Sequence, residues 1–203
     1  MDDSVVIALF RHGLTEANKR KEYVGWADSP LSTDVKMLPL KREYECYFSS
    51  NLKRCVDTAK CLFPQAAPVC LHELREMNFG VWEGKTYEDL KEDGHYQKWL
   101  SAPFSICPPK GESFQQFSVR VEAGWEKLKD EIFSKNISRC AVITHGGVIR
   151  YLLTKYAPEP KEFWTWQVPH HLGLELIFNK DSLRRDERCT LLQEVPLTEK
   201  EPG

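Results

Sequence analysis

Six apolar residues at positions 5–10 run directly into Arg11, His12 and Gly13, and this junction constrains the fold more than any other part of the chain. An apolar run of this length is typical of a strand buried in a sheet. Its end would deliver a cation, an imidazole and a flexible turn to the carboxyl edge of that sheet, where open α/β folds bind ligands. Alone the junction is weak evidence for a ligand site, because a histidine after a strand is often an ordinary loop residue.

A second apolar run repeats the pattern. Residues 140–144 are followed by His145, Gly146 and Gly147, and then by a helical pattern at residues 148–153. If the two runs pair in one parallel sheet, with strands about 5 Å apart, both imidazoles can reach one bound anion. The glycines let backbone N–H groups approach that anion, and the start of the helix adds a positive dipole end.

A third strand-like run, residues 46–48, leads into the Ser-Ser-Asn cluster at residues 49–51. Such a cluster is typical of a helix N-cap, so we expect Arg54 in the first turn of a helix that starts at the same edge of the sheet. The alternative for Arg54 is a solvated position on the helix surface. If Arg54 instead lies in that first turn at the sheet edge, its guanidinium faces the same crevice as the two histidines.

The carboxylate of Glu76 lies in a loop-like stretch, residues 74–84, that also carries aromatic rings and glycines. A carboxylic acid in such surroundings is a candidate proton donor. The segment from about residue 77 to 111 is predicted to form a small cap over the strand ends. Its aromatic residues can be lid residues or local core, and a small cap needs most of them for its own packing. They are Phe79, Trp82, Tyr87, Tyr96, Trp99 and Phe104.

Four segments in order, residues 11–18, 49–54, 76–84 and 144–150, resemble the histidine phosphatase, or phosphoglycerate-mutase-like, superfamily. The likeness runs from Val5 to about Lys155. Residues 76–84, with residues 108–113 and Arg120, are most similar to the α-ribazole phosphatase and broad-specificity phosphatase branch. The chain departs from the family pattern after Pro30-Leu31, where members usually carry a longer helix before Ser49-Ser50. Here that stretch is short and contains Pro39, which weighs against the helix.

The resemblance implies an α/β fold with a mainly parallel central sheet flanked by helices and a small cap over the carboxyl ends of the strands. It also implies a phosphomonoesterase that works through a phosphohistidine, with no cofactor and no metal, because arginines supply the charge that magnesium supplies elsewhere. His12 would be the nucleophile, and two nearby guanidinium groups would favour its neutral form. Glu76 would protonate the leaving alkoxide. The groups expected to hold phosphate are Arg11, Asn18, Arg54, His145 and Gly146.

The rim of the site is the least defined part of this prediction. Trp82 in the cap is one candidate for contact with substrate. His171 is another, because the pair His170-His171 follows the Trp-rich residues 163–166 and can lie near the mouth of a pocket. No carboxylate stands at ligand spacing from this pair, so a metal role is not expected.

Composition sets the remaining bounds. A chain of 203 residues is expected to form one domain, residues 1–203, with a frayed polar tail from about 196 to 203. A net charge of −2 does not indicate that the chain binds nucleic acid. Seven cysteines without a Cys-x-x-Cys argue against a disulfide framework and a zinc ribbon, and favour a reducing cytoplasm. The acidic start and the short apolar run behind it predict neither a signal peptide nor a membrane span.

The rest of the chain is predicted to be scaffold. Residues 114–132 carry apolar side chains at helical spacing, and Ser113 with Gln116 predicts a capping box at the start. Residues 174–178 and 190–195 read as two strands of a hairpin across the charged turn at 180–188.

Two other functions remain open beside a small-molecule phosphatase. A phosphoglycerate mutase must clamp a carboxylate, and no arginine lies between Arg75 and Arg120 to do so. A module that binds a phospho-ligand without chemistry would not need His12, Arg54, Glu76 and His145 together. Hydrolysis is therefore favoured, and the aromatic cap favours an α-ribazole-like or other ring-bearing 5′-phosphate as the substrate. The sequence predicts no oligomeric state.

Overall fold

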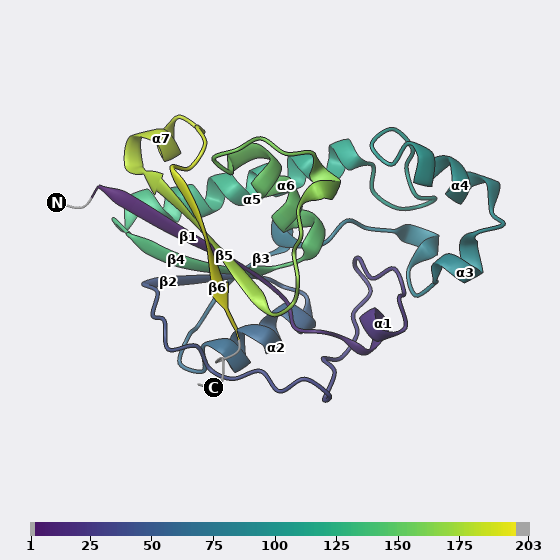
Figure 1. Ribbon diagram of the computed structural model, residues 1–203, viewed down its shortest axis with the longest axis horizontal. Helices are drawn as coiled ribbons and strands as arrows, with labels where there is room; N and C mark the ends of the chain where they lie inside the picture. The colour runs from purple at the N-terminus through teal and green to yellow at the C-terminus, as the bar shows by residue number, and fades with distance from the viewer. Residues whose placement is uncertain (1–2, 198–203) are drawn as a thin grey trace.

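The computed structural model describes residues 3–197, which form a six-stranded mixed sheet with helices on both faces (Figure 1). The strand order is β3-β2-β4-β1-β5-β6. The four strands β3, β2, β4 and β1 are parallel, and β5 and β6 extend the sheet antiparallel. The predicted α/β class is confirmed. The strands are β1 (Ser4–Arg11), β2 (Cys46–Ser50), β3 (Val69–Leu71), β4 (Arg139–Thr144), β5 (Leu172–Asn179) and β6 (Leu191–Pro196).

Helices cover the sheet on both sides because its central strands are apolar on both faces. In Figure 1, α5 (Phe114–Ser134), α6 (Gly146–Tyr156) and α7 (Lys180–Arg184) lie above the sheet, and α2 (Lys53–Leu62) lies below it. Alternation along β1 explains this layering. Val5, Ile7 and Leu9 join the core under α5 and α6, and Ala8 and Phe10 join the core against α2.

The longest helix, α5, begins and packs as its sequence predicts. Ser113 is the N-cap, and its side chain accepts from the Gln116 N–H in the predicted capping box. Trp125 is buried on this helix and stacks on Tyr156 of α6 with ring centroids 4.6 Å apart. This packing fixes α5 and α6 together against one face of the sheet.

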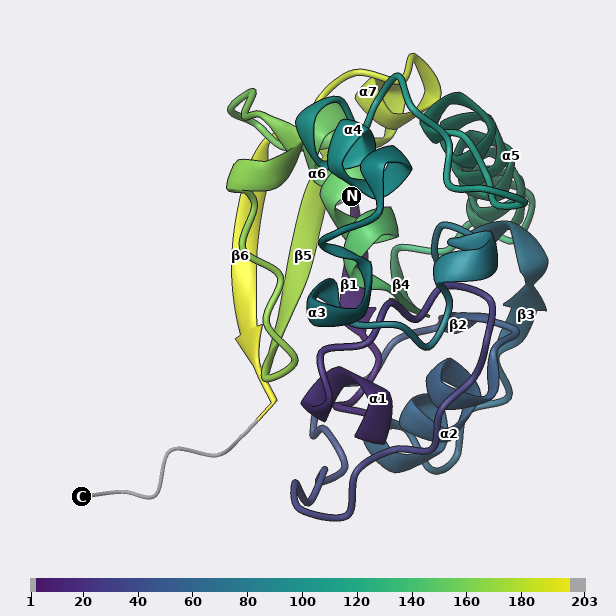
Figure 2. The same cartoon turned by 90° about the vertical axis from the view of Figure 1, so that its right-hand side faces the viewer.

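A separate lobe between β3 and α5 forms the cap. It contains α3 (Tyr87–Leu90), α4 (Gly94–Ser101) and a 3₁₀ turn at Gly80–Trp82. Figure 1 shows α3 and α4 at the right of the sheet, and Figure 2, seen from that side, shows them in front of the strand ends. The cap has a small core of its own, made of Trp82, Leu90, Tyr96 and Trp99.

The segment before β2 contains no helix beyond the four-residue α1 (Glu16–Lys19), and residues 20–45 are all described. The absence of the longer family helix agrees with the position of Pro39. Further short 3₁₀ turns lie at His72–Leu74 and Phe163–Thr165. Across residues 3–197, no helix is long and apolar enough to cross a bilayer.

The C-terminal part differs from the prediction at its end. The hairpin of β5 and β6 is confirmed, with α7 inside the predicted charged turn. Pro196 and Leu197, predicted to begin a frayed tail, are ordered instead, because Pro196 pairs with Leu172 and the Leu197 N–H donates to the His171 carbonyl at 3.0 Å. Residues 198–203 of that tail lie outside the described residues.

Candidate active site

The two strand-end histidines meet because β1 and β4 are parallel neighbours in matched register. Arg11 is paired with Thr144, and the His12 N–H donates to the Thr144 carbonyl at 2.9 Å. Both strands therefore end at the same level of the sheet. The rings of His12 and His145 stand 5.2 Å apart, centroid to centroid, at the carboxyl edge.

His12 is almost completely buried, with 4% of its surface exposed. Its Nδ1 lies 2.8 Å from the carbonyl of Gly13. A carbonyl can only accept, so Nδ1 carries the proton and Nε2 keeps its lone pair. Burial lowers the pKa of His12 well below its usual value, and the nearby charges of Arg54 and Arg11 lower it further. The ring is thus held neutral, with a free Nε2.

His145 is fully buried and has a partner at each ring nitrogen. Arg54 Nη2, which can only donate, lies 3.2 Å from Nδ1, so Nε2 carries the proton and donates to Ser50 Oγ at 2.9 Å. Burial, and then the charge of Arg54, lowers the pKa of His145 well below its usual value. A bond from His145 to a phosphate oxygen would therefore exchange one of these two contacts.

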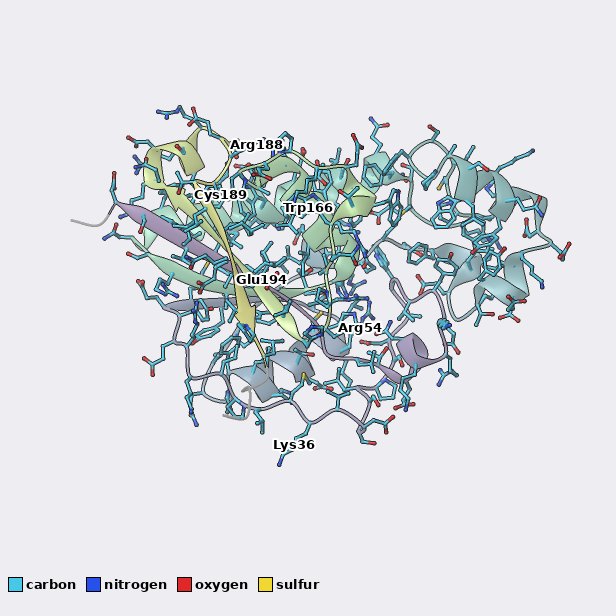
Figure 3. The ribbon with its side chains drawn as sticks, viewed as in Figure 1. Lys36, Arg54, Trp166, Arg188, Cys189 and Glu194 are labelled. Atoms are coloured by element: carbon cyan, nitrogen blue, oxygen red, sulfur yellow. The ribbon has the colours of Figure 1, made fainter. Side chains whose placement is uncertain are left out.

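Arg54 sits in the first turn of α2, as predicted, and is 1% exposed, so it is not a solvated surface arginine. Figure 3 shows its side chain at the end of α2 that lies nearest the cap. The predicted cap of α2 is wrong. Leu52 is the N-cap and makes no side-chain cap bond, and the carboxylate of Asp28 accepts from the N–H groups of Lys53 and Arg54 instead.

Arg11, which is partly buried, and Arg54, which is buried, each keep a buried Nε–H that lacks a partner within residues 3–197. Arg11 Nη1 donates to the Val168 carbonyl at 2.8 Å, and Arg54 Nη1 lies 3.3 Å from Asp28 Oδ1. Within residues 3–197, neither Arg11 Nε nor Arg54 Nε has a hydrogen-bond partner, although both atoms are buried. A buried unpaired donor on a charged group is costly, so both positions call for an acceptor.

Glu76 is held against the start of α6. Its Oε2 accepts from the Gly147 N–H at 2.9 Å and its Oε1 from the Met77 N–H at 3.0 Å. A Cβ at Gly147 would lie 2.2 Å from Oε1, so any larger residue there would displace this carboxylate. Arg120 on α5 donates to the carbonyls of Arg75 and Glu76, at 2.9 and 3.1 Å, and so fixes the backbone that carries the carboxylate.

The two remaining predicted phosphate ligands lie beside the same cluster. Asn18 Oδ1 accepts from the Thr15 N–H in the capping box of α1, which leaves Nδ2 without a partner in the described part of the chain. Gly146 is the first residue of α6, and a Cβ there would lie 3.4 Å from both Arg11 Cζ and Arg150 Nη1. The start of α6 is therefore flanked by two guanidinium groups.

The two predicted rim residues lie elsewhere. Trp82 is fully buried in the core of the cap, because a small lobe needs a large ring at its centre. His171 is exposed and lines a second, smaller cavity beside Gly13 and Met37. Its neighbour His170 is the one that reaches the site. The Nδ1 of His170 donates to the His12 carbonyl at 2.7 Å, and the two rings stand 5.4 Å apart.

An apolar cavity of about 490 Å³ opens beside Glu76, between the cap and α6. Aromatic rings from both sides form its wall, and Arg150 of α6 contributes a guanidinium whose Nε donates to the Trp166 carbonyl at 3.1 Å. Arg150 lies outside the cap, so the absence of arginine between Arg75 and Arg120 does not leave this cavity without a guanidinium. Residues 3–197 contain no cluster of three or more His, Cys, Asp or Glu side chains able to hold a metal ion. The aromatic lining residues are Tyr23, Phe79, Trp99, Phe114, Phe117, Phe163 and Trp164.

Comparison with known proteins identifies the family. The sequence model of the histidine phosphatase superfamily (branch 1) matches residues 7–184. The chain belongs to the histidine phosphatase superfamily. The predicted family is thus confirmed, and the protein is a phosphatase.

Individual relatives include phosphatases and a mutase. The adenosylcobalamin/alpha-ribazole phosphatase of Escherichia coli is 32% identical over 172 residues, which are 79% of this chain and 83% of that protein. The alpha-ribazole phosphatase structure from Shigella flexneri aligns with a TM-score of 0.77 and 28% identity, over 87% of this chain and 92% of that one. A 2,3-bisphosphoglycerate-dependent phosphoglycerate mutase from Rhizobium etli is 28% identical over 165 residues, 72% of this chain and 77% of that protein.

Acidification should destabilise the fold through the buried imidazoles. Burial, and then the charge of Arg11, lowers the pKa of His170 to about 4 from the ordinary 6.5. Between these values the unfolded chain holds a proton that the folded chain does not, so the free energy of unfolding falls as the pH drops from 6.5 to 4. His170→Asn can keep a donor for the His12 carbonyl and removes the titrating ring. We expect about one proton fewer taken up on unfolding at pH 5.

The measurement is the slope of the unfolding free energy against pH between 4.5 and 6, taken from urea titrations of both proteins. Equal slopes would contradict the assignment of a depressed pKa to His170.

Proposed function

We propose that this phosphatase is a metal-independent phosphomonoesterase that works through a phosphohistidine on His12. One observation carries the proposal: a neutral imidazole with a free Nε2 lies beside the guanidinium groups of Arg11 and Arg54, each of which keeps a buried, unpartnered Nε–H. A phosphoryl group supplies the acceptors that these donors lack. Its negative charge offsets the two cations, and its phosphorus is the electrophile for Nε2.

In the first step, His12 Nε2 attacks phosphorus and the bond from phosphorus to the leaving oxygen breaks. The Nδ1 proton stays bonded to the Gly13 carbonyl, which supports the positive charge that develops on the ring. Glu76, held on the Gly147 N–H, gives its proton to the departing alkoxide. This step leaves a phosphohistidine, a free alcohol and a Glu76 carboxylate.

In the second step, water enters the place of the alcohol and Glu76 takes its proton. The oxygen of that water bonds to phosphorus as the bond from phosphorus to His12 breaks. The products are inorganic phosphate and a neutral His12, and Glu76 is protonated again. Arg11, Arg54 and the free Nδ2 of Asn18 hold the equatorial oxygens in both steps, and Gly146 offers the start of α6.

Metal independence is inferred from the charges at the site. In this mechanism the guanidinium groups of Arg11 and Arg54 lie beside the transferred phosphoryl group, and they would supply the neutralisation that divalent ions supply in other phosphoryl-transfer sites.

For the substrate, we propose a phosphate ester whose alcohol carries a ring, such as α-ribazole 5′-phosphate, because the cavity beside Glu76 is walled by aromatic side chains. The alpha-ribazole phosphatases among the relatives support this choice. Phosphoglycerate mutase is the second candidate, favoured by Arg150 on the same wall, since a guanidinium suits a planar carboxylate.

We also propose that the protein works in a reducing compartment such as the cytoplasm. All seven cysteines are free, and Cys55, Cys140 and Cys189 are buried as thiols.

His12→Ala is expected to abolish turnover and phosphoenzyme formation and to leave the fold intact, because the ring lies at a strand end and outside the apolar core. The measurement is acid-labile phosphate on the protein after rapid quenching with a labelled phosphomonoester. The control is His95→Ala, which removes an exposed histidine of the cap. Acid-labile phosphate on the His12 variant would refute the nucleophile assignment.

Glu76→Gln should slow alkyl phosphates far more than aryl phosphates, by about 10²-fold or more in the ratio of kcat/KM, because a phenolate leaves without a proton and an alkoxide does not. Steady-state rates on glycerol phosphate and 4-nitrophenyl phosphate give the comparison. Equal losses on both esters would mean that Glu76 is not the acid.

Trp164→Ala should lower kcat/KM for α-ribazole 5′-phosphate by up to about tenfold, since a ring contact contributes about 0.5–1.5 kcal/mol. The rate with 3-phosphoglycerate should stay the same. Tyr87→Ala is the control, because Tyr87 and Trp164 are each 54% exposed and only Trp164 lines the cavity. A preference of the unmodified protein for 3-phosphoglycerate, or transfer of phosphate between glycerate positions, would favour the mutase instead.

A further inference from the structure

A carboxylate of the cap, that of Glu83, accepts four backbone N–H groups and forms no ion pair within residues 3–197. One donor, Phe79, is local to the cap, at 3.0 Å. The other three come from a loop far away in the sequence. They are Gly25 at 2.9 Å, Trp26 at 2.9 Å and Ala27 at 3.1 Å.

The opposite edge of this loop, residues 24–27, faces Arg54. Arg54 Nη2 donates to the Gly25 carbonyl at 2.7 Å, and Nη1 donates to the Ala27 carbonyl at 2.9 Å. The loop therefore lies between an anion and a cation, with N–H groups toward Glu83 and carbonyls toward Arg54. The peptide group between Gly25 and Trp26 bonds to both charges, because its N–H donates to Glu83 and its carbonyl accepts from Arg54, so each charge supports the other through the loop.

Little room exists for the loop to shift. A Cβ at Gly25 would lie 2.0 Å from the Met77 carbonyl oxygen and 2.5 Å from Glu83 Oε1. The loop is pressed directly against the cap at this point. Its carbonyls consequently hold a defined position relative to Arg54.

The carbonyls of Gly25 and Ala27 determine which N–H donor of Arg54 stays unpartnered. The Nη groups of Arg54 are taken by the loop, by Asp28 and by His145 Nδ1, and only the buried Nε–H is left. If the carbonyls of Gly25 and Ala27 moved, the guanidinium would lose its orientation and so would the Nε–H.

We propose that Glu83 is a positioning residue for the phosphate site. Through the loop at residues 24–27 it holds Arg54 in the orientation that leaves Nε–H free for phosphate, and it makes phosphate affinity depend on the correct docking of the cap. This inference rests on the proposed function, because it takes Arg54 to be a phosphate ligand.

The test measures the dissociation constant of inorganic phosphate for the full chain by calorimetry. Glu83→Gln puts an amide where four donors converge, and a neutral group accepts them more weakly. We expect phosphate to bind about tenfold or more weakly. Asp89→Asn is the matched control, because Asp89 is also a cap carboxylate that accepts a backbone N–H, from Thr86 at 2.9 Å, without reaching the loop. We expect it to change the affinity by less than about twofold.

A double-mutant cycle shows whether Glu83 acts through Arg54. Arg54→Lys keeps the charge but cannot bridge the carbonyls of Gly25 and Ala27. In that background the effect of Glu83→Gln should shrink to less than about twofold. An undiminished effect there, or wild-type affinity in the Glu83→Gln single variant, would overturn the proposal.

Near-ultraviolet circular dichroism and the melting temperature establish that each variant is folded. Should Glu83→Gln not fold, Glu83→Asp carries the test, since it keeps the charge and is shorter by one methylene. It should weaken phosphate binding by an intermediate factor, and wild-type affinity in that variant would refute the proposal. Phosphate binding needs no turnover. The absence of a phosphohistidine during turnover would therefore contradict the proposed function. An unaltered phosphate affinity in the Glu83 variants would contradict only this inference.

Discussion

The parallel pairing of β1 with β4 is the constraint on which the site depends. Its register sets Arg11 opposite Thr144, and the next residue of each strand is a histidine. A shift by one residue would turn one of these side chains to the other face of the sheet. The register itself is fixed by burial, because Val5, Ile7 and Leu9 pack on one face of β1 and Ala8 and Phe10 on the other. The chemistry at the strand ends is thus a consequence of the core packing.

Two guanidinium groups with buried Nε atoms lie beside two buried imidazoles, and together they form a site that lacks an anion. Burial lowers the pKa of Arg11. The charges of Arg150 and Arg54 lower it further, and the charge of Glu76 raises it. His12 and His145 respond to the same field by staying neutral. The arginines are kept in place by backbone carbonyls and by Asp28, so much of their hydrogen bonding is satisfied without full neutralisation of their charge. In the proposed reaction a phosphate dianion completes this arrangement, so affinity and catalysis would draw on the same groups.

The sequence predicted what local patterns encode. Five of the six strands, the capping box of α5 and the place of Arg54 in the first turn of α2 follow from periodicity and from helix-start signals. Contacts between distant segments were not predictable. Asp28 caps α2 from 25 residues upstream, and nothing around it marks that role. The sequence predicts Trp82 at the rim and the structure buries it, because an aromatic residue in a cap carries no sign of which way it points. The adjacent residues His170 and His171 look alike in the sequence, but of the two only His170 reaches the His12 carbonyl.

The two halves of the site are built differently, and this separates chemistry from specificity. The phosphate half comes from strand ends and helix starts, where register, close glycine contacts and charge leave few alternatives. The proposed leaving-group half comes from the cap, α6 and the turn at Phe163–Thr165, and its outer residues Leu100 and Trp164 are about half exposed. Exposed side chains change at little cost in stability, whereas buried charged ones do not. A fold arranged in this way can keep one reaction centre and vary the alcohol that it accepts, which fits a family whose members include both phosphatases and a mutase.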